Sequence, residues 1–294
     1  MKSLAVFYLV IMSMICTTAQ AATPEIKMRW LGGPSLLITF NDLTLLTDPM
    51  LGQGENAFIM ADPNEMFDLK KGPNVKTHSR LTTLPKFNLK ALDLILISHA
   101  HEDHFDQAAQ QKLDKSLPLL LPTQDHKKIN GYGFDNLFAL KPGDTRVYKA
   151  GNGTLTLTAV PADHSENEKL LPLLGHGLGY FIKFKEGNWQ RTVYWSGDSM
   201  ATERVINFVK TLGQVDIFIP NMGRVGTTGP LGQISLGAKE ATLMAATLGA
   251  KKIFPIHHST FDLYLEPISE LKKQAEQAQL SLDVISEGET LIYK

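Results

Sequence analysis

The segment His99-Ala100-His101-Glu102-Asp103-His104 concentrates three of the nine histidines of this 294-residue chain within six positions. It directly follows Leu92 to Ser98, a continuous apolar run that predicts a buried β-strand. Residues two positions apart on an extended backbone point the same way, so the imidazoles of His99 and His101 can reach one metal ion. The segment therefore predicts a metal site at the end of a core strand.

Asp103 and His104 follow at the turn into a helix, which we expect to begin near Asp106 because aspartate commonly caps helix N-termini. Their side chains can point to a second ion beside the first. Imidazole suits zinc, copper, iron or nickel, and a carboxylate extends the choice to manganese. The alternative is a polar turn with solvated histidines, which we disfavour because the apolar strand fixes the turn at the edge of a core.

The composition excludes several classes of protein. Hydrophobic residues make up 43% and charged residues 20% of the chain, as in a globular protein rather than a disordered one. The net charge of −1 provides no basic surplus for nucleic acid, and no Lys/Arg run indicates contact with a membrane surface. We therefore expect a small-molecule substrate and no nucleic-acid partner, and the sequence predicts no oligomeric state.

The N-terminus has the organisation of a secretory signal peptide. Met1-Lys2 supply a positive start, Leu4 to Cys16 an apolar run, and Ala19-Gln20-Ala21 a small-x-small cleavage site. The apolar run is short for a helix that spans a bilayer. We predict cleavage after Ala21, which would give a signal peptide over residues 1–21 and a mature domain over residues 22–294. This predicts export across the inner membrane to the periplasm, without a stable membrane anchor.

Cleavage would also restrict the metal chemistry. Cys16 is the only cysteine, so the mature chain would have neither a disulfide nor a thiolate ligand. A lipid anchor at Cys16 is the alternative, but Ser13-Met14-Ile15 lacks the small residues expected before a lipidated cysteine. Any metal site in the mature chain must therefore use histidine, aspartate and glutamate.

The mature chain predicts a single layered α/β domain, since no linker or low-complexity tract divides it. Residues 50–88 lack regular periodicity, and we expect them to form a lid or binding loop. Besides Leu92 to Ser98, the expected strands are Met28 to Leu31, Ser35 to Phe40, Leu43 to Thr47, Leu155 to Val160, Gly179 to Lys185, Arg191 to Trp195, Asp216 to Pro220 and Lys252 to Ile256. The other expected helices are Thr202 to Leu212, Ser235 to Leu248 and Ile268 to Gln279.

Together with further segments, the His99 to His104 motif resembles the metallo-β-lactamase superfamily, whose signature is His-x-His-x-Asp-His at a strand end. The resemblance runs from about Arg29 to Phe261 and implies a four-layer αββα metallo-β-lactamase sandwich of the α/β class. The segments that carry it are Trp30-Leu31-Gly32, Thr47-Asp48-Pro49, Pro161-Ala162-Asp163-His164-Ser165, Trp195-Ser196-Gly197-Asp198-Ser199 and Pro255-Ile256-His257-His258-Ser259-Thr260-Phe261.

The resemblance implies seven metal ligands. One ion would be held by His99, His101 and His164, the other by Asp103, His104 and His257, and Asp198 would bridge the two.

Two more residues have roles that the resemblance suggests. His258 is the alternative to His257 as ligand, and otherwise it would line the pocket or donate a proton. Asp48 would hydrogen-bond a ligand histidine. The alternative for Asp48 is a turn-forming Asp-Pro pair.

Two departures from sister families narrow the expected activity. The flavodiiron oxidoreductases have a glutamate where His101 stands, so His101 favours hydrolysis over oxygen chemistry. Class B β-lactamases of the common type use a cysteine ligand, which the mature chain would lack. The patterns Trp-Ser-Gly-Asp and Pro-x-His-x-x-Thr-Phe are similar to the branch that contains ascorbate-6-phosphate lactonase and the N-acylphosphatidylethanolamine-hydrolysing phospholipase D.

We therefore expect an exported, metal-dependent hydrolase with two divalent ions, zinc first and manganese or iron as alternatives. A hydroxide bridging the ions would attack an ester, lactone or phosphodiester. Asp103 or His258 would carry the proton to the leaving group. Two alternatives stay open: a non-catalytic metal-binding protein that retains the fold, and a metallo-β-lactamase-like amidohydrolase.

Four other polar residues have weaker signals. His176, in Gly175-His176-Gly177, would either reach the substrate or play a structural part. Arg224 would either bind an anionic group or lie on the surface. His78 and His126 have the surroundings of ordinary loop and surface residues.

Overall fold

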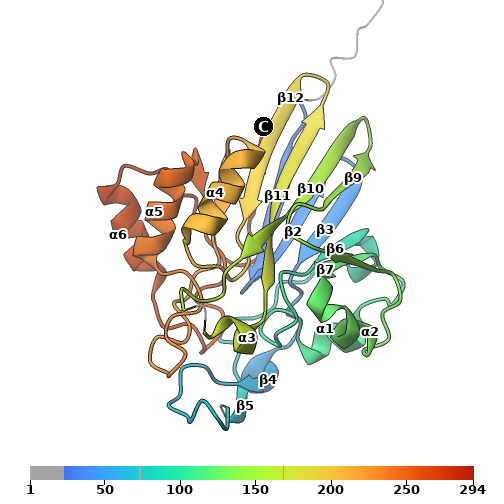
Figure 1. The fold of residues 1–294 in the computed structure, drawn as a ribbon. Helices are drawn as coiled ribbons and strands as arrows, with labels where there is room; N and C mark the ends of the chain where they lie inside the picture. Colours follow the sequence, from blue (N-terminus) through green and yellow to red (C-terminus); the bar gives the residue numbers. More distant parts are fainter. Residues whose placement is uncertain (1–22, 73, 168) are drawn as a thin grey trace, which may run out of the picture.

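Two mixed β-sheets face each other in the computed structural model, which describes residues 23–72, 74–167 and 169–294 (Figure 1). The predicted signal peptide lies outside the described residues. The first sheet has the order β15-β1-β2-β3-β6-β7-β8 and the second β14-β13-β12-β11-β10-β9. The strands of the first sheet are β1 (Ile26–Gly32), β2 (Ser35–Phe40), β3 (Leu43–Thr47), β6 (Leu94–Leu96), β7 (Leu119–Pro122), β8 (Leu137–Leu140) and β15 (Thr290–Tyr293). Those of the second are β9 (Thr145–Ala150), β10 (Gly153–Ala162), β11 (Gly177–Glu186), β12 (Trp189–Trp195), β13 (Ile217–Ile219) and β14 (Lys252–Ile253).

Helices cover the outer faces of both sheets (Figure 1). The helices α1 (Gln107–Lys112) and α2 (His126–Asn130) lie beside the first sheet, whereas α4 (Glu203–Leu212), α5 (Ala238–Leu248) and α6 (Ile268–Gln277) lie beside the second. The short α3 (Leu171–Leu174) lies at one end of the molecule. The predicted four-layer αββα sandwich is therefore confirmed. None of the helices within the described residues is long and apolar enough to cross a bilayer.

The alternation of side chains along each strand explains how the layers pack. Along β11, the side chains of Tyr180, Ile182 and Phe184 are buried between the two sheets, whereas Phe181 is buried under the helices of the second sheet. Successive side chains of a strand point to opposite faces, so one strand supplies two cores. Burial on both faces follows from helices that cover a sheet already packed on another sheet.

The central strand β6 brings the His99 segment to the edge of the sheet. It pairs in parallel with β3 and β7, and the side chains of Leu94 and Leu96 pack between the sheets while Ile95 packs toward α1 and α2. A parallel strand buried on both faces has a continuous apolar sequence, as this one does. The predicted run from Leu92 to Ser98 therefore contains β6, and the chain leaves the sheet directly before His99.

Residues 50–88 are more ordered than the sequence predicts. They contain an antiparallel hairpin formed by β4 (Phe58–Ala61) and β5 (Val75–His78). The prediction of a surface position for His78 is wrong, because its side chain is only 1% exposed. Its ring stacks on Phe58, its hairpin partner, at 4.8 Å between centroids. Phe58 also packs edge-to-face on Phe261, at 5.3 Å between centroids, and this contact attaches the hairpin to the body of the domain.

Candidate metal centre

The seven predicted ligands meet at one edge of the sandwich, where several core strands end. His99 to His104 connect β6 to α1, and His164 follows β10. Asp198 follows β12, which pairs in parallel with β13. His257 follows β14, where an isolated bridge joins Asn221 to Ile256. The carboxyl ends of parallel strands share one edge of a sheet, so segments far apart in sequence converge there.

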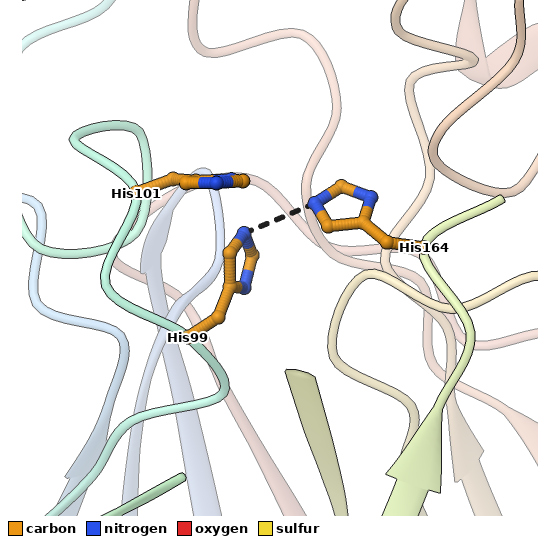
Figure 2. A group of neighbouring side chains, drawn as sticks. All are labelled: His99, His101 and His164. Atoms are coloured by element: carbon orange, nitrogen blue, oxygen red, sulfur yellow. Dashed lines mark hydrogen bonds between the residues drawn. The ribbon is translucent and has the colours of Figure 1, made fainter. Parts of the chain in front are cut away.

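The first group consists of His99, His101 and His164. One ligand atom from each lies within 4.8 Å of the others. Figure 2 shows the His99 and His164 rings pointing toward each other, and their Nε2 atoms are 3.2 Å apart. The ring of His101 lies 4.5 Å from that of His99 and 5.3 Å from that of His164. Three imidazoles that converge in this way match the protein ligands of one zinc-type ion.

The second group consists of Asp103, His104, Asp198 and His257, whose ligand atoms also lie within 4.8 Å of one another. Nε2 of His104 is 3.4 Å from a carboxylate oxygen of Asp198 and 3.8 Å from one of Asp103. Nε2 of His257 is 3.9 Å from the other oxygen of Asp198. The rings of His99 and His104 are 4.1 Å apart, so the two groups are neighbours. The bridging role of Asp198 stays a prediction.

Unpartnered polar atoms test whether metal ions fit this site. Nine buried side-chain atoms of the described residues have no hydrogen-bond partner, and three of them are Oδ1 of Asp103, Nε2 of His104 and Nε2 of His257. Such atoms are costly to bury unless something else satisfies them. All three belong to the second ligand group, and imidazole and carboxylate are suitable ligands for zinc, iron or manganese. The residues present therefore fit a metal centre.

The predicted hydrogen bond between Asp48 and a ligand histidine is present, and the histidine is His104. Oδ2 of Asp48 lies 2.7 Å from Nδ1 of His104, and both side chains are fully buried. Ser98 donates its backbone N–H to Oδ1 of Asp48 at 2.7 Å and its hydroxyl to Oδ2 at 2.6 Å. A carboxylate that accepts from Nδ1 leaves the Nε2 lone pair free for a metal.

Backbone carbonyls orient two more of the predicted ligands. Nδ1 of His164 lies 2.8 Å from the carbonyl of Ile234, and Nδ1 of His257 lies 2.8 Å from the carbonyl of Met222. A carbonyl can only accept, so each Nδ1 carries the proton and each Nε2 is left as the lone-pair atom. Both rings are therefore held in the tautomer that can bind metal.

Asp198 is positioned by residues whose part in the site the sequence does not predict. Asn221 donates from Nδ2 to Oδ1 of Asp198 at 2.9 Å, and the indole of Trp195 donates to Oδ1 of Asn221 at 2.9 Å. Asn221 follows β13, and its isolated bridge to Ile256 lies on the segment that carries His257. The sequence does predict that the strands at these two residues end near the site. No sequence spacing, however, indicates that Trp195 and Asn221 form a hydrogen bond.

The helix α2 holds the ligand loop from outside. Lys128 donates to the carbonyl of Ala100 at 2.5 Å and to Oε1 of Glu102 at 2.8 Å. Asp125 accepts the backbone N–H of Ala100 at 3.1 Å. These contacts fix the backbone between His99 and His101 on both its donor and its acceptor side.

Burial and neighbouring charges set the protonation states. Burial, reinforced by the other histidines, lowers the pKa of His99 well below its usual value, and burial together with His164 lowers the pKa of His101 to about 3. These rings are therefore neutral, as ligands must be. Burial alone would raise the pKa of Asp198, but the nearby histidines, His257 first, hold it well below its usual range. Burial alone would lower the pKa of His104, but the carboxylates of Asp198, Asp103 and Asp48 raise it well above its usual value. Neutral His99 and His101 thus lie beside an ionised Asp198 that faces His104.

Two residues of the centre have strained backbone. Asp48 and His257 have positive φ angles of 27° and 61°. Such conformations cost roughly 1–3 kcal/mol each for residues other than glycine and persist where the surroundings enforce them. Gly197, next to Asp198, has φ +56°, and a Cβ there would lie 2.6 Å from the carbonyl oxygen of Leu178 and 2.9 Å from Cβ of Ser98. The Trp-Ser-Gly-Asp pattern therefore has a steric reason for its glycine.

His258 lies apart from the ligand groups. Its ring packs on Trp30 with centroids 4.5 Å apart, and its Nδ1 is 3.0 Å from the hydroxyl of Ser259. Burial lowers its pKa to about 4. His257 belongs to the second group and His258 to neither, as the preference for His257 as ligand expects.

A cavity of about 400 Å³ opens over the centre. His101, Asp103 and His164 line it together with Glu102, and the rest of its wall is apolar. A wider groove of about 770 Å³ lies along residues 83–87 and near Lys112, but none of the predicted ligands lines it. The smaller cavity is therefore the candidate substrate site. Asp103 lines it and His258 does not.

The remaining polar candidates lie elsewhere. His176 lines a separate cavity with Arg204 and Lys141. Arg224 hydrogen-bonds Gln233 and lies 3.6 Å from Glu266. Neither lines the cavity over the centre. His126 is exposed, as predicted.

Comparisons with known proteins agree with this fold. A family model described as the beta-lactamase superfamily domain matches residues 45–258. The chain is 22% identical over 268 residues to a UPF0173 metal-dependent hydrolase of Pyrobaculum aerophilum, which covers 91% of this chain and 96% of the relative. It is 27% identical over 302 residues to another, from Thermodesulfovibrio yellowstonii, which covers 96% and 98%. The crystal structure of isothiocyanate hydrolase from Delia radicum gut bacteria has a similar fold, with a TM-score of 0.73, 22% identity and coverage of 90% and 98%.

Proposed function

Because this chain belongs to the beta-lactamase superfamily, we propose that it is a metal-dependent hydrolase of small molecules whose centre holds two divalent ions, zinc in the first place. The observation that carries the proposal is the pair of adjacent ligand groups, one with three histidines and one with two carboxylates and two histidines. The relatives from Pyrobaculum aerophilum and Thermodesulfovibrio yellowstonii, described as metal-dependent hydrolases, support it.

The chemistry divides between the ions and the chain. Two divalent ions lower the pKa of a shared water and polarise the bond to be cleaved. His99, His101 and His164 would hold one ion, and Asp103, His104, His257 and Asp198 the other. An ester, lactone or phosphodiester would enter through the cavity that His101 and Asp103 line.

Asp103 is the residue that we propose for proton transfer. Its Oδ2 faces His104, whereas its Oδ1 has no hydrogen-bond partner. One oxygen can therefore bind metal while the other accepts the proton of the attacking water and passes it to the leaving group. The Oδ1 atom belongs to a side chain that lines the cavity, where a substrate would lie.

Substitution of His101 tests the proposal. His101→Ala should abolish turnover and remove the ion of its own group, because His101 is one of only three histidines in that group. The exposed His126→Ala is the matched control and should retain both. The panel of substrates should contain a nitrophenyl ester, a lactone, a phosphodiester and an aryl isothiocyanate, the last because the similar structure is an isothiocyanate hydrolase. Turnover that persists in metal-depleted protein would contradict the proposal.

The alternative of a non-catalytic metal-binding protein predicts a different result from the same panel. Such a protein would bind metal with the wild-type ligands and turn over none of the substrates. The complete set of seven predicted ligands favours the enzyme, since loss of ligands is the usual sign of an inactive relative.

We also propose export to the periplasm with removal of residues 1–21, on the composition of that segment alone. Mass spectrometry of the protein from a periplasmic extract should find Ala22 at the N-terminus.

A further inference from the structure

The cavity over the metal centre is lined by two chemically different sets of residues. Its polar lining is confined to His101, Glu102, Asp103 and His164. The rest of the lining is an apolar wall that comes from three parts of the chain: the β4–β5 hairpin, including Pro63 between its strands, α3, and the loop before α5. Its residues are Ile59, Met60, Ala61, Pro63, Val75, Leu173, Leu174, Leu231 and Ile234.

The apolar wall has a buried floor and an exposed rim. Leu174, Leu231 and Ile234 are almost completely buried and belong to one core cluster with Phe58 and Phe261. By contrast, Ile59 is 52%, Val75 68% and Leu173 54% exposed. In Figure 1, α3 and the β4–β5 hairpin lie at the same end of the molecule. Exposed apolar side chains gathered around a concave site mark a surface that binds an apolar ligand.

No described residue of this lining carries a positive charge. Lys128, next to Glu102 of the lining, is held by Glu102 and the carbonyl of Ala100. Lys76, on β5, pairs with Asp62 and Glu65. Arg224 lies 3.6 Å from Glu266 outside the cavity. An anionic group on the part of the substrate that contacts the apolar wall would therefore lose its hydration without gaining a positively charged partner.

The buried floor of the apolar wall directly contacts a predicted metal ligand. The carbonyl of Ile234 accepts from Nδ1 of His164, so the same short segment forms part of the apolar wall and orients a predicted ligand. A substrate arm that lies on this wall is thereby placed next to the ions. The volume of about 400 Å³ is near the lower end of the range of ligand pockets, roughly 300–1,000 Å³, which favours a compact substrate.

We propose that the substrate is a compact molecule whose hydrolysable group carries an uncharged, apolar arm, and that this arm lies between the β4–β5 hairpin and α3. The proposal rests on the proposed hydrolase function and adds the class of its substrate. It makes Leu173 and Val75 determinants of specificity.

Two esters with the same leaving group test the arm directly. p-Nitrophenyl hexanoate and mono-p-nitrophenyl adipate have acyl chains of equal length, but only the second ends in a carboxylate. We expect kcat/KM to be at least about tenfold higher for the hexanoate, because the adipate must desolvate a charge against an apolar wall. From acetate to hexanoate, kcat/KM should rise about threefold to fourfold with each methylene until the cavity is filled.

A matched pair of variants tests whether the preference for the hexanoate arises at the rim of the cavity. Leu173→Lys places a cation on the rim and should reduce the preference for the hexanoate at least fivefold, roughly 1 kcal/mol. Leu243 is a similarly exposed leucine, 60% exposed, on α5 and outside the cavity. Leu243→Lys should leave the preference unchanged.

Binding to metal-free protein separates this proposal from the hydrolase proposal. Hexanamide and its anionic analogue adipamate, titrated by NMR, should differ at least about tenfold in Kd in favour of hexanamide. Preferred binding of hexanamide without cleavage of any ester would support the arm and contradict the hydrolase. Cleavage of the adipate as efficiently as the hexanoate would overturn the arm and leave the hydrolase intact. No binding of hexanamide together with no cleavage would overturn both.

Discussion

Nδ1 of His104 lies 2.7 Å from a carboxylate oxygen of Asp48, a residue 56 positions earlier in the chain. Neither side chain is exposed to solvent. The pair joins the end of β3 to the ligand loop after β6, two parallel neighbours in the first sheet. The contact therefore holds the ring of His104 against a residue at the end of a core strand.

Asp48→Asn should weaken metal binding about 10- to 100-fold with little change in shape. An amide NH₂ that faces Nδ1 of His104 would move the ring proton to Nε2, the atom meant for the metal. Competition with a chromogenic chelator measures the affinity. Asp114→Asn, at a surface turn, is the control and should bind metal like the wild type. Equal affinities of Asp48→Asn and wild type would show that the pair does not set the tautomer.

Lys128→Met should weaken metal binding about threefold to tenfold, because the loop between His99 and His101 loses a donor to Ala100 and to Glu102. The variant keeps the aliphatic length of the side chain. Lys127→Met, on the exposed side of α2, should have no effect. Isothermal titration with zinc compares the two, and an equal loss in both variants would rule out a positioning role for Lys128.

Gly197→Ala should destabilise the protein by about 2 kcal/mol or more, because the new methyl group meets the carbonyl oxygen of Leu178 at a positive φ. Gly187 has nearly the same φ, +54° against +56°, but no atom within 4 Å of a Cβ built there. Gly187→Ala should cost only about 1 kcal/mol, so the difference measures the clash. Chemical denaturation checks both values, and equal losses would contradict the close approach.

The stability of the metal-free protein should depend on the ionisation of Asp106. Burial raises the pKa of this carboxyl from 3.8 to about 6. The folded state therefore holds its proton more tightly than the unfolded chain from about pH 4 to about pH 6, so this group's contribution to the free energy of unfolding falls as the pH rises through that window.

Asp106→Asn removes that dependence while it keeps a side chain that can cap α1. The free energy of unfolding of the wild type minus that of the variant should fall by up to about 3 kcal/mol from pH 4 to pH 6. Urea denaturation at each pH measures it. A difference that stays level, or rises, across this window would contradict the burial of the carboxyl.

The sequence predicts the layers and the ligand strands well because the signal there is local. Ser35 to Phe40 and Leu43 to Thr47 coincide with β2 and β3, and Asp106 caps α1 as expected by accepting the N–H of Ala109. The helix predicted from Ser235 begins later, at Ala238, since Ser235 instead bonds Val225 and the extended Gly237 precedes the first turn.

Other elements depend on partners far away in the sequence. β15 is formed by half-exposed residues that pair with β1 far away in the chain, as Tyr293 does with Ile26 and Thr290 with Arg29, and no local pattern predicts it. The same holds within the site for Trp195 and Asn221, and for Tyr264, whose ring packs on His257 at 4.5 Å. Their roles arise from tertiary contacts, which composition and periodicity do not contain.

The number of metal ions per chain tests the central proposal most directly. Purified protein, dialysed against excess zinc and then against buffer, should contain two ions per chain by inductively coupled plasma mass spectrometry, and His257→Ala should contain one. A wild-type protein that holds one ion or none under these conditions would contradict the two-ion centre.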